Sequence, residues 1–316
     1  MEMILKEACD LVVNNYRKLK DSLRYDGDLL NHFGSLVIGN KSTDESILKI
    51  KNIRTIIKNK TPRMSEFRGD ILYMVSILIS KEPNVDEYIE EILKVYDDML
   101  QYGFTESPHL VLSAYAIVKH GNVHELDLIM KNMMEIYKVM KVNYKDITNE
   151  EDYLECALLA LNGIDKEKSI LYMEKWFNSV VKLNMFSKNG VQGLTLALLL
   201  NHNNPEFNLV SQFLKEFQNK DIKISHQVLA LLGIAAGEEE PNAYVKKVKS
   251  VIEYLCDKEY EYEFYMDKSF IAFIAIALVE ITKDDKKDKF LDELISMVVY
   301  SFITSKKQGI VSEILA

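Results

Sequence analysis

An internal repeat constrains this chain of 316 residues more than any other feature of its sequence. When residues 152–200 are shifted back by 82 positions, they meet residues 70–118 without a gap. Apolar residues then coincide along the whole overlap, including Leu154 with Leu72, Ala157 with Val75, Leu171 with Ile89, Phe186 with Phe104 and Leu194 with Leu112. Shifted forward by 74 to 78 positions, with a small insertion near Tyr260, the same pattern meets residues 226–279. Coincidence over this length predicts three copies of one structural unit.

Each copy has the hydrophobic spacing of four helices. In the second copy, residues 152–162 are apolar almost all round, residues 166–184 are amphipathic, and residues 190–200 are again short and apolar. A further amphipathic segment closes each copy, at residues 123–141, 205–219 and 285–304. A helix that is apolar all round is buried, whereas an amphipathic helix keeps one face in water. Twelve such helices make six hairpins of about 40 residues, a size typical of helical-hairpin repeats.

The predicted fold is therefore all-α. We expect an α-α superhelix or toroid of about six helical hairpins, arranged as three four-helix repeats, because no hairpin can bury its own apolar face. Residues 63–316 form this predicted repeat domain. Residues 1–62 depart from the repeat and are predicted to form an N-terminal helical cap, with helices at 4–23, 28–38 and 44–58. Only 5 prolines and 12 glycines occur, which agrees with a nearly all-helical chain.

A short element at the start of the first copy carries a family resemblance. Phe67 and Arg68 open a buried helix, and an acidic amphipathic helix, a phenylalanine and a second buried helix follow. In this order of elements the chain resembles a bacterial family known as domain of unknown function 4003, over nearly its whole length. The resemblance implies no activity, because that family has no catalytic residues to carry over.

Charge and cysteine content limit the partners that this chain is expected to have. The net charge is −9 at pH 7, which disfavours nucleic acid because phosphate neutralisation supplies most of such binding. Cys9, Cys156 and Cys256 are far apart and lie among apolar residues, as is typical of a reducing compartment. The longest apolar run, residues 270–281, is too short to span a bilayer, and acids rather than bases follow Met1. We therefore expect a cytoplasmic protein that binds neither nucleic acid nor membrane.

The starts of the short buried helices supply the candidate site residues. If the hairpins alternate in direction, all these starts lie on one rim, where helix N-termini favour anions. The candidate ligand-binding residues on that rim are Glu66, Arg68, Asp70, His109, Asp152 and His226. The competing interpretation is capping, because Ser, Asp and Asn before a helix usually satisfy its free N–H groups. Arg68 is the exception: a cation opposes the dipole there and needs a partner, for which Glu66 and Asp70 are the candidates.

A second candidate is a basic stretch inside the predicted cap of this acidic protein. Six basic residues fall close together there: Lys49, Lys51, Arg54, Lys58, Lys60 and Arg63. A run of charge is usually a solvated helix face, and the functional alternative is a patch for an anionic partner. The sequence leaves both interpretations open.

Two functions fit these observations. An open superhelix would bind a protein or peptide on its concave face, and would need no chemistry. A closed toroid would enclose a cavity in which an enzyme could act on a carbohydrate or another small molecule, with Arg68, Asp70 and either His109 or His226 in catalytic roles. The sequence has no phosphate-binding loop, dinucleotide fingerprint, metalloprotease motif or nucleophile elbow. We therefore predict a binding or scaffold protein without catalytic activity, metal or cofactor.

Small-angle X-ray scattering distinguishes the two arrangements. The count of six hairpins favours closure, and a radius of gyration of about 20 Å, the value for a compact chain of this length, would indicate a closed toroid. A clearly larger value from a monodisperse monomer would indicate the open superhelix.

Overall fold

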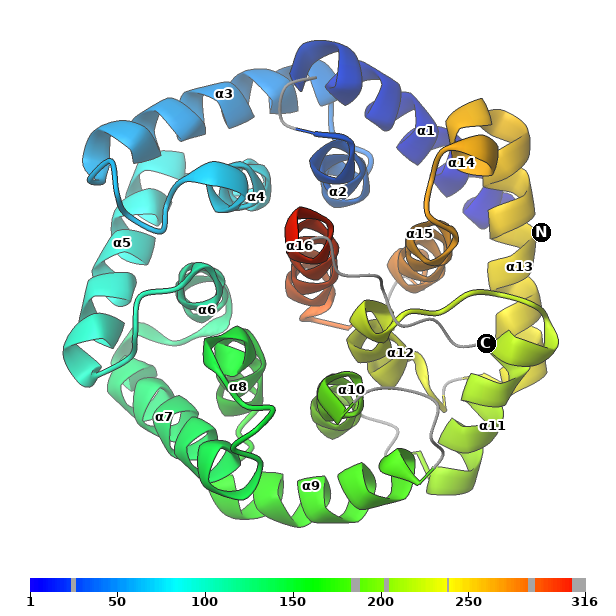
Figure 1. Cartoon of the computed structure of the whole chain (residues 1–316). Coiled ribbons are helices and arrows are strands. Elements are labelled where there is room, and N and C mark those ends of the chain that lie inside the picture. The colour runs from blue at the N-terminus through cyan, green and yellow to red at the C-terminus, as the bar shows by residue number, and fades with distance from the viewer. Residues whose placement is uncertain (24–26, 183–187, 202–204, 238, 284–287, 309–316) are drawn as a thin grey trace. The chain divides into compact units, whose positions relative to one another are not determined.

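The chain is helical throughout the part that its structure describes. A computed structural model describes residues 1–23, 27–182, 188–201, 205–237, 239–283 and 288–308 (Figure 1). Within these ranges there are sixteen α-helices, α1 to α16, three short 3₁₀ turns, η1 to η3, and no strand. The predicted all-α class is confirmed. No described helix combines the length and the apolar character that a membrane span requires.

The chain divides into two compact units, whose boundaries fall inside α1 and α9. One unit contains residues 19–171, and the other contains residues 1–18 together with 172–316. The predicted division into a cap of residues 1–62 and a repeat domain of residues 63–316 stays a prediction.

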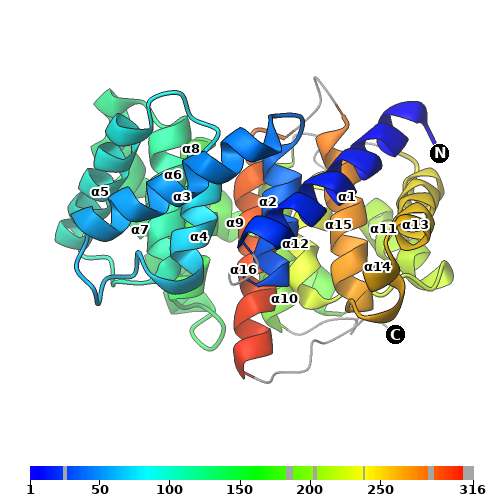
Figure 2. The ribbon, with the colours of Figure 1, turned by 90° about the horizontal axis from the view of Figure 1, so that it is seen from above.

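In the unit of residues 19–171, short helices pack in a row and longer helices pack against them. Contacts link α2 to α4, α4 to α6 and α6 to α8, while α3, α5 and α7 each pack on the short helix that follows. Figure 1 shows these short helices end-on, and Figure 2 shows them from the side, where α3 crosses them. The elements are the end of α1 (Met3–Leu23), α2 (Asp28–Ile38), α3 (Thr43–Lys60), α4 (Gly69–Ile79), α5 (Val85–Tyr102), α6 (Pro108–His120), η1 (Val123–Glu125), α7 (Leu126–Asn143), η2 (Glu150–Asp152), α8 (Tyr153–Leu161) and the start of α9 (Lys166–Val181).

In the other unit, α10 and α12 pack closely against each other. Gly233 makes this approach possible, because a Cβ atom at that position would lie 2.5 Å from the Cβ of Ala197. The long helix α13 packs against both α11 and α15, and α16 contacts α12 and α15. Besides the start of α1 and the end of α9, the elements are α10 (Lys188–Leu200), α11 (Phe207–Asn219), η3 (His226–Val228), α12 (Leu229–Ala235), α13 (Pro241–Lys258), α14 (Tyr260–Phe264), α15 (Lys268–Ile281) and α16 (Leu291–Gln308).

The difference between short and long helices follows from their sequences. The short helix α4 has Ile, Leu, Met and Val on nearly every side, and its residues from Ile71 to Ile79 are buried apart from Tyr73. The long helix α5 buries one stripe and exposes the acids between its members. That stripe has helical spacing and consists of Ile89, Ile92, Val95, Tyr96 and Met99.

The positions of the predicted helices are confirmed wherever the structure describes the residues concerned, but α16, which the sequence predicts to be amphipathic, is buried on every side from residue 291 to residue 299. Each of the twelve segments predicted for the three copies contains a helix, as do the three predicted for the cap. The last helix begins at Leu291 rather than at residue 285, and residues 284–287 lie outside the described part. Phe186, which supported the repeat, also lies outside it. The insertion that the sequence placed near Tyr260 forms an additional helix, α14.

A buried ion pair explains why Glu280 interrupts the apolar run of α15. Its carboxylate accepts a hydrogen bond from the Tyr244 hydroxyl at 2.6 Å, and the Lys283 ammonium lies 2.8 Å from its second oxygen. The Glu280 and Lys283 side chains are only 4% and 10% exposed. Because a buried charge is tolerated only when it is paired, these three residues form a polar link between α13 and the C-terminal end of α15.

Candidate functional site: a basic pocket beside α3

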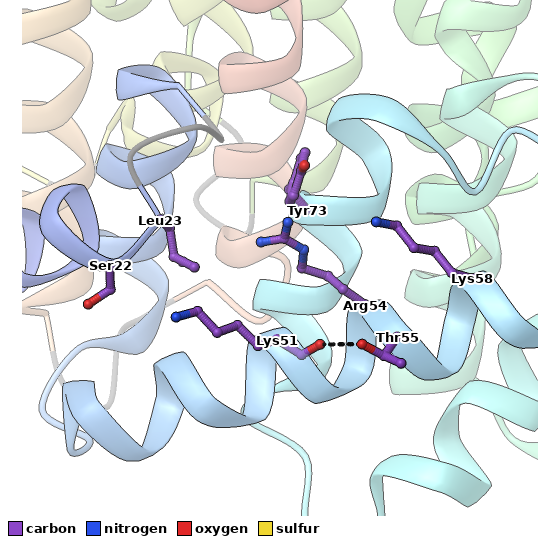
Figure 3. A pocket seen from close by; sticks show the side chains of 7 residues that line it. All are labelled: Ser22, Leu23, Lys51, Arg54, Thr55, Lys58 and Tyr73. Atoms are coloured by element: carbon purple, nitrogen blue, oxygen red, sulfur yellow. Dashed lines mark hydrogen bonds between the residues drawn. The ribbon is translucent and has the colours of Figure 1, made fainter.

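A pocket of about 350 Å³ lies beside α3, within the unit of residues 19–171 (Figure 3). Three helices contribute to its wall: the C-terminal end of α1, one face of α3, and α4. The lining residues are Ser22, Leu23, Lys51, Arg54, Thr55, Lys58 and Tyr73. Three of the seven are cationic, so the pocket is strongly basic in a protein of net charge −9.

Helical spacing brings the basic residues of α3 to the pocket. Residues 51, 54, 55 and 58 are separated by three and four positions, so their side chains leave the helix on one face. The residues that bury an adjacent side of α3 follow the same spacing and include Ile50, Ile53 and Ile57. The burial of these isoleucines determines which way α3 is turned, and the basic face therefore points outward to the pocket.

A stacking contact orients the central cation of the pocket. The guanidinium carbon of Arg54 lies 3.9 Å from the ring centroid of Tyr73, close enough for a cation–π interaction. On the same face, the Thr55 hydroxyl donates a hydrogen bond to the main-chain oxygen of Lys51 at 3.0 Å. Figure 3 shows Lys51, Arg54 and Lys58 extending to the same side of α3.

The positive charge of the pocket is not neutralised by the ion pair on the same helix. Lys60, at the end of α3, pairs with Glu90 at 2.7 Å, but neither residue lines the pocket. Among the described residues, no carboxylate lies within 4.0 Å of the ammonium of Lys51 or Lys58. The like charges of Lys51 and Lys58 on one face of α3 repel each other, and an anion placed near them relieves that repulsion.

The chemistry available in the pocket is anion binding. Lysine supplies a flexible point charge, and arginine supplies a planar fork of donors, so together they suit phosphate or carboxylate oxygens. Leu23 and Tyr73 add an apolar wall for the rest of a ligand. The lining residues that the structure describes include no carboxylate, imidazole or thiol. Within the described ranges, no group of three or more His, Cys, Asp and Glu side chains is placed to hold a metal ion.

Arg68, the leading candidate of the predicted rim, interacts with the end of α3. Its guanidinium donates to the main-chain oxygens of Lys58 at 3.1 Å, Thr61 at 2.6 Å and Phe67 at 2.8 Å, and also to the Thr61 hydroxyl. The last carbonyls of a helix lack intrahelical partners, and a cation near them complements the helix dipole. Arg68 therefore binds the C-terminal end of α3, whereas the sequence suggested Glu66 or Asp70 as its partner.

The remaining rim candidates do not line the basic pocket. Glu66 and Asp70 flank Arg68 at the start of α4, and Asp152 accepts a hydrogen bond from the Asn149 main-chain N–H at 2.9 Å in a capping box. His109 lies buried in the first turn of α6, and His226 lies in η3 of the other unit. The role of all six as ligand-binding residues stays a prediction.

Burial makes His109 an unsuitable proton carrier near neutral pH. It lowers the pKa of His109 to about 4, because the charged imidazolium loses its hydration inside the protein. The side chain is consequently neutral at pH 7.

A buried glutamate that the sequence analysis did not single out lies in α8. Glu155 is 8% exposed, and burial, followed by the nearby charges of Asp152 and Glu151, raises its pKa well above that of an ordinary carboxyl. The sequence did not reveal it, because an acid within the mostly apolar residues 152–162 looks like an ordinary solvent-facing position.

Substituting Arg68 tests its role at the end of α3. We expect Arg68→Ala to lower the free energy of unfolding by about 1–3 kcal/mol, because charged hydrogen bonds to the last carbonyls of α3 are lost. Arg63→Ala is the matched control, since Arg63 is exposed and precedes α4 in the same connection. Urea denaturation measures both variants. Equal stability of Arg68→Ala and the wild type would show that these bonds contribute nothing.

The raised pKa of Glu155 predicts a pH dependence of stability. The unfolded chain loses this proton near the ordinary value of 4.5, while the folded protein keeps it to higher pH, so the stability contribution falls as pH rises above that value. Glu155→Gln removes the titration. We expect it to raise the free energy of unfolding at pH 8 and to have no such effect at pH 4. Glu106→Gln, at an exposed position of the same unit, serves as the control, and a destabilised Glu155→Gln variant at pH 8 would contradict the expectation.

Comparison with known proteins identifies a family. No curated protein and no solved structure matches the chain. A family model described as a protein of unknown function, DUF4003, matches residues 15–308. The resemblance drawn from the order of the helices is thus confirmed, and the chain belongs to the DUF4003 family of proteins of unknown function.

Proposed function

We propose that this chain is a binding protein that holds a small phosphate-bearing molecule in the pocket beside α3. The observation that supports this most strongly is the convergence of Lys51, Arg54 and Lys58 on one pocket of an otherwise acidic protein. On a solvated helix face, the basic side chains would extend into water alone. Here α1 and α4 contribute Ser22, Leu23 and Tyr73 to a wall beside them. The anionic-partner interpretation of the basic stretch is therefore preferred to the solvated face.

The size and lining of the pocket support a small ligand rather than a polymer. A volume of about 350 Å³ lies in the lower part of the range for small-molecule sites. The lysines and Arg54 would bind the phosphate oxygens, and the Ser22 and Thr55 hydroxyls offer further polar contacts. Leu23 would contact the apolar part of the ligand.

Binding without catalysis is part of the proposal. None of the described lining residues has a carboxylate or imidazole that could act as a general base at neutral pH. On the predicted rim, Arg68 and Asp152 already have structural roles at helix ends, and His109 is neutral at pH 7. These observations give the enzyme alternative no support. A cytoplasmic location, inferred from cysteine usage, belongs to the same proposal.

Calorimetric titration with inorganic pyrophosphate tests the proposed function. We expect the wild type to bind it, and Lys51→Met and Lys58→Met each to weaken binding about tenfold, because each removes one charge-assisted hydrogen bond. Lys49→Met is the matched control: it changes the net charge equally and lies on α3, but Lys49 does not line the pocket.

Two results would contradict the proposal. One is a wild-type protein that does not bind pyrophosphate. The other is an equal loss of affinity in Lys49→Met, which would show that general electrostatic attraction, rather than the pocket, holds the anion. Thermal unfolding of each variant confirms that it is folded, and full stability is expected because Lys51 and Lys58 are exposed.

A further inference from the structure

Three large aromatic side chains lie together on the surface at α14, in the unit of residues 1–18 and 172–316. Tyr260, Phe264 and Tyr265 are 61%, 58% and 78% exposed. The ring centroids of Tyr260 and Phe264 are 4.5 Å apart, and those of Tyr260 and Tyr265 are 5.9 Å apart. Single exposed aromatic residues are common, but a contiguous cluster is typical of a binding surface. We call these three residues the α14 aromatic cluster.

The inner side of α14 is held firmly by α1, which it meets within the same unit. Tyr262 is fully buried, with its ring centroid 6.1 Å from that of Tyr16. The Tyr16 hydroxyl donates to Glu261 at 2.8 Å, and Arg17 forms an ion pair with Glu259 at 2.8 Å. Figure 1 shows α14 beside α13, with which it also packs. The aromatic cluster is thus presented on a fixed support, and little conformational entropy is lost when a partner binds it.

The position of α14 in the chain also indicates a binding role. It occupies the insertion that distinguishes the third copy of the predicted repeat, between α13 and α15. At the corresponding place in the first copy, residues 103–107 join α5 to α6 without a helix. Insertions into repeats usually map to one face, which is often the face that binds a partner.

The charges around the cluster specify the chemistry of that partner. Residues 253–268 contain six acids and two lysines. Of the acids, Glu259 and Glu261 make the contacts to α1 described above, whereas Asp257 and Glu263 are exposed. Asp257 and Glu263 both lie close enough to Cys256 to add to the effect of burial in raising the pKa of its thiol, so the two carboxylates share one neighbourhood. Carboxylates and the negative faces of aromatic rings both attract cations.

We propose that the α14 aromatic cluster, with Asp257 and Glu263, binds an arginine- and lysine-rich segment of a partner protein. Guanidinium groups stack on the exposed rings, and the two carboxylates form ion pairs with neighbouring basic side chains. This surface is separate from the anion pocket, since it lies on the other unit and selects the opposite charge. The proposal therefore does not depend on the proposed function.

Fluorescence anisotropy with a labelled peptide of alternating arginine and serine tests this proposal on the full chain. We expect the wild type to bind the peptide, and the triple variant Tyr260→Ser, Phe264→Ser and Tyr265→Ser to bind it at least about tenfold more weakly. The net charge of the triple variant is unchanged, so general attraction to an acidic protein stays constant. Its three substitutions replace solvent-facing side chains, and circular dichroism confirms that it folds.

A second triple variant provides the matched control. Leu128→Ser, Val142→Ser and Leu171→Ser replace three other exposed apolar side chains and should leave the affinity unchanged. Asp257→Asn combined with Glu263→Gln should weaken binding and reduce its salt dependence. The proposal is overturned if the α14 triple variant binds as well as the wild type. It is also overturned if the wild type does not bind the peptide. One such outcome is a wild type that dimerises through the cluster while the α14 triple variant is monomeric.

Discussion

The burial of short apolar helices on nearly every side is the constraint on which the rest of the structure depends. In α4, apolar residues surround the helix axis, and one neighbour alone cannot cover them. Short helices therefore pack on other short helices, and longer helices cover the remaining side. Long amphipathic helices such as α3 and α5 bury only one stripe, so their other faces are left to polar residues. The basic residues that line the pocket beside α3 are consequently found on a long helix.

The basic pocket shows how this constraint produces a site. The isoleucines of α3 bury one side of the helix and thereby direct Lys51, Arg54 and Lys58 outward. Arg68 binds the last carbonyls of α3 from the connection that follows. Tyr73 belongs to α4, the short helix on which α3 packs, and its ring meets Arg54. The same packing that stabilises the fold therefore positions the three cations and their aromatic support.

The sequence predicts the helices and the basic stretch because both depend on spacing along the chain. Buried and exposed positions of α3 follow the helical period, and the caps at Ser107 and Asn149 are formed by residue types that usually cap helices. The sequence does not predict the stack of Arg54 on Tyr73 or the bonds of Arg68 to α3, because these contacts join separate elements. The raised pKa of Glu155 could not be predicted from the sequence either. It results from burial and from nearby carboxylates, which hydrophobic spacing does not reveal.

The central claim is that the cations of α3 form an anion site, and anomalous diffraction tests it most directly. Crystals of the protein grown with tungstate, a heavy analogue of a tetrahedral oxyanion, would reveal the anion by its own scattering. The account predicts an anomalous peak within hydrogen-bond distance of Lys51, Arg54 and Lys58. An ordered tungstate bound elsewhere on the protein, with no peak in this pocket, would contradict it.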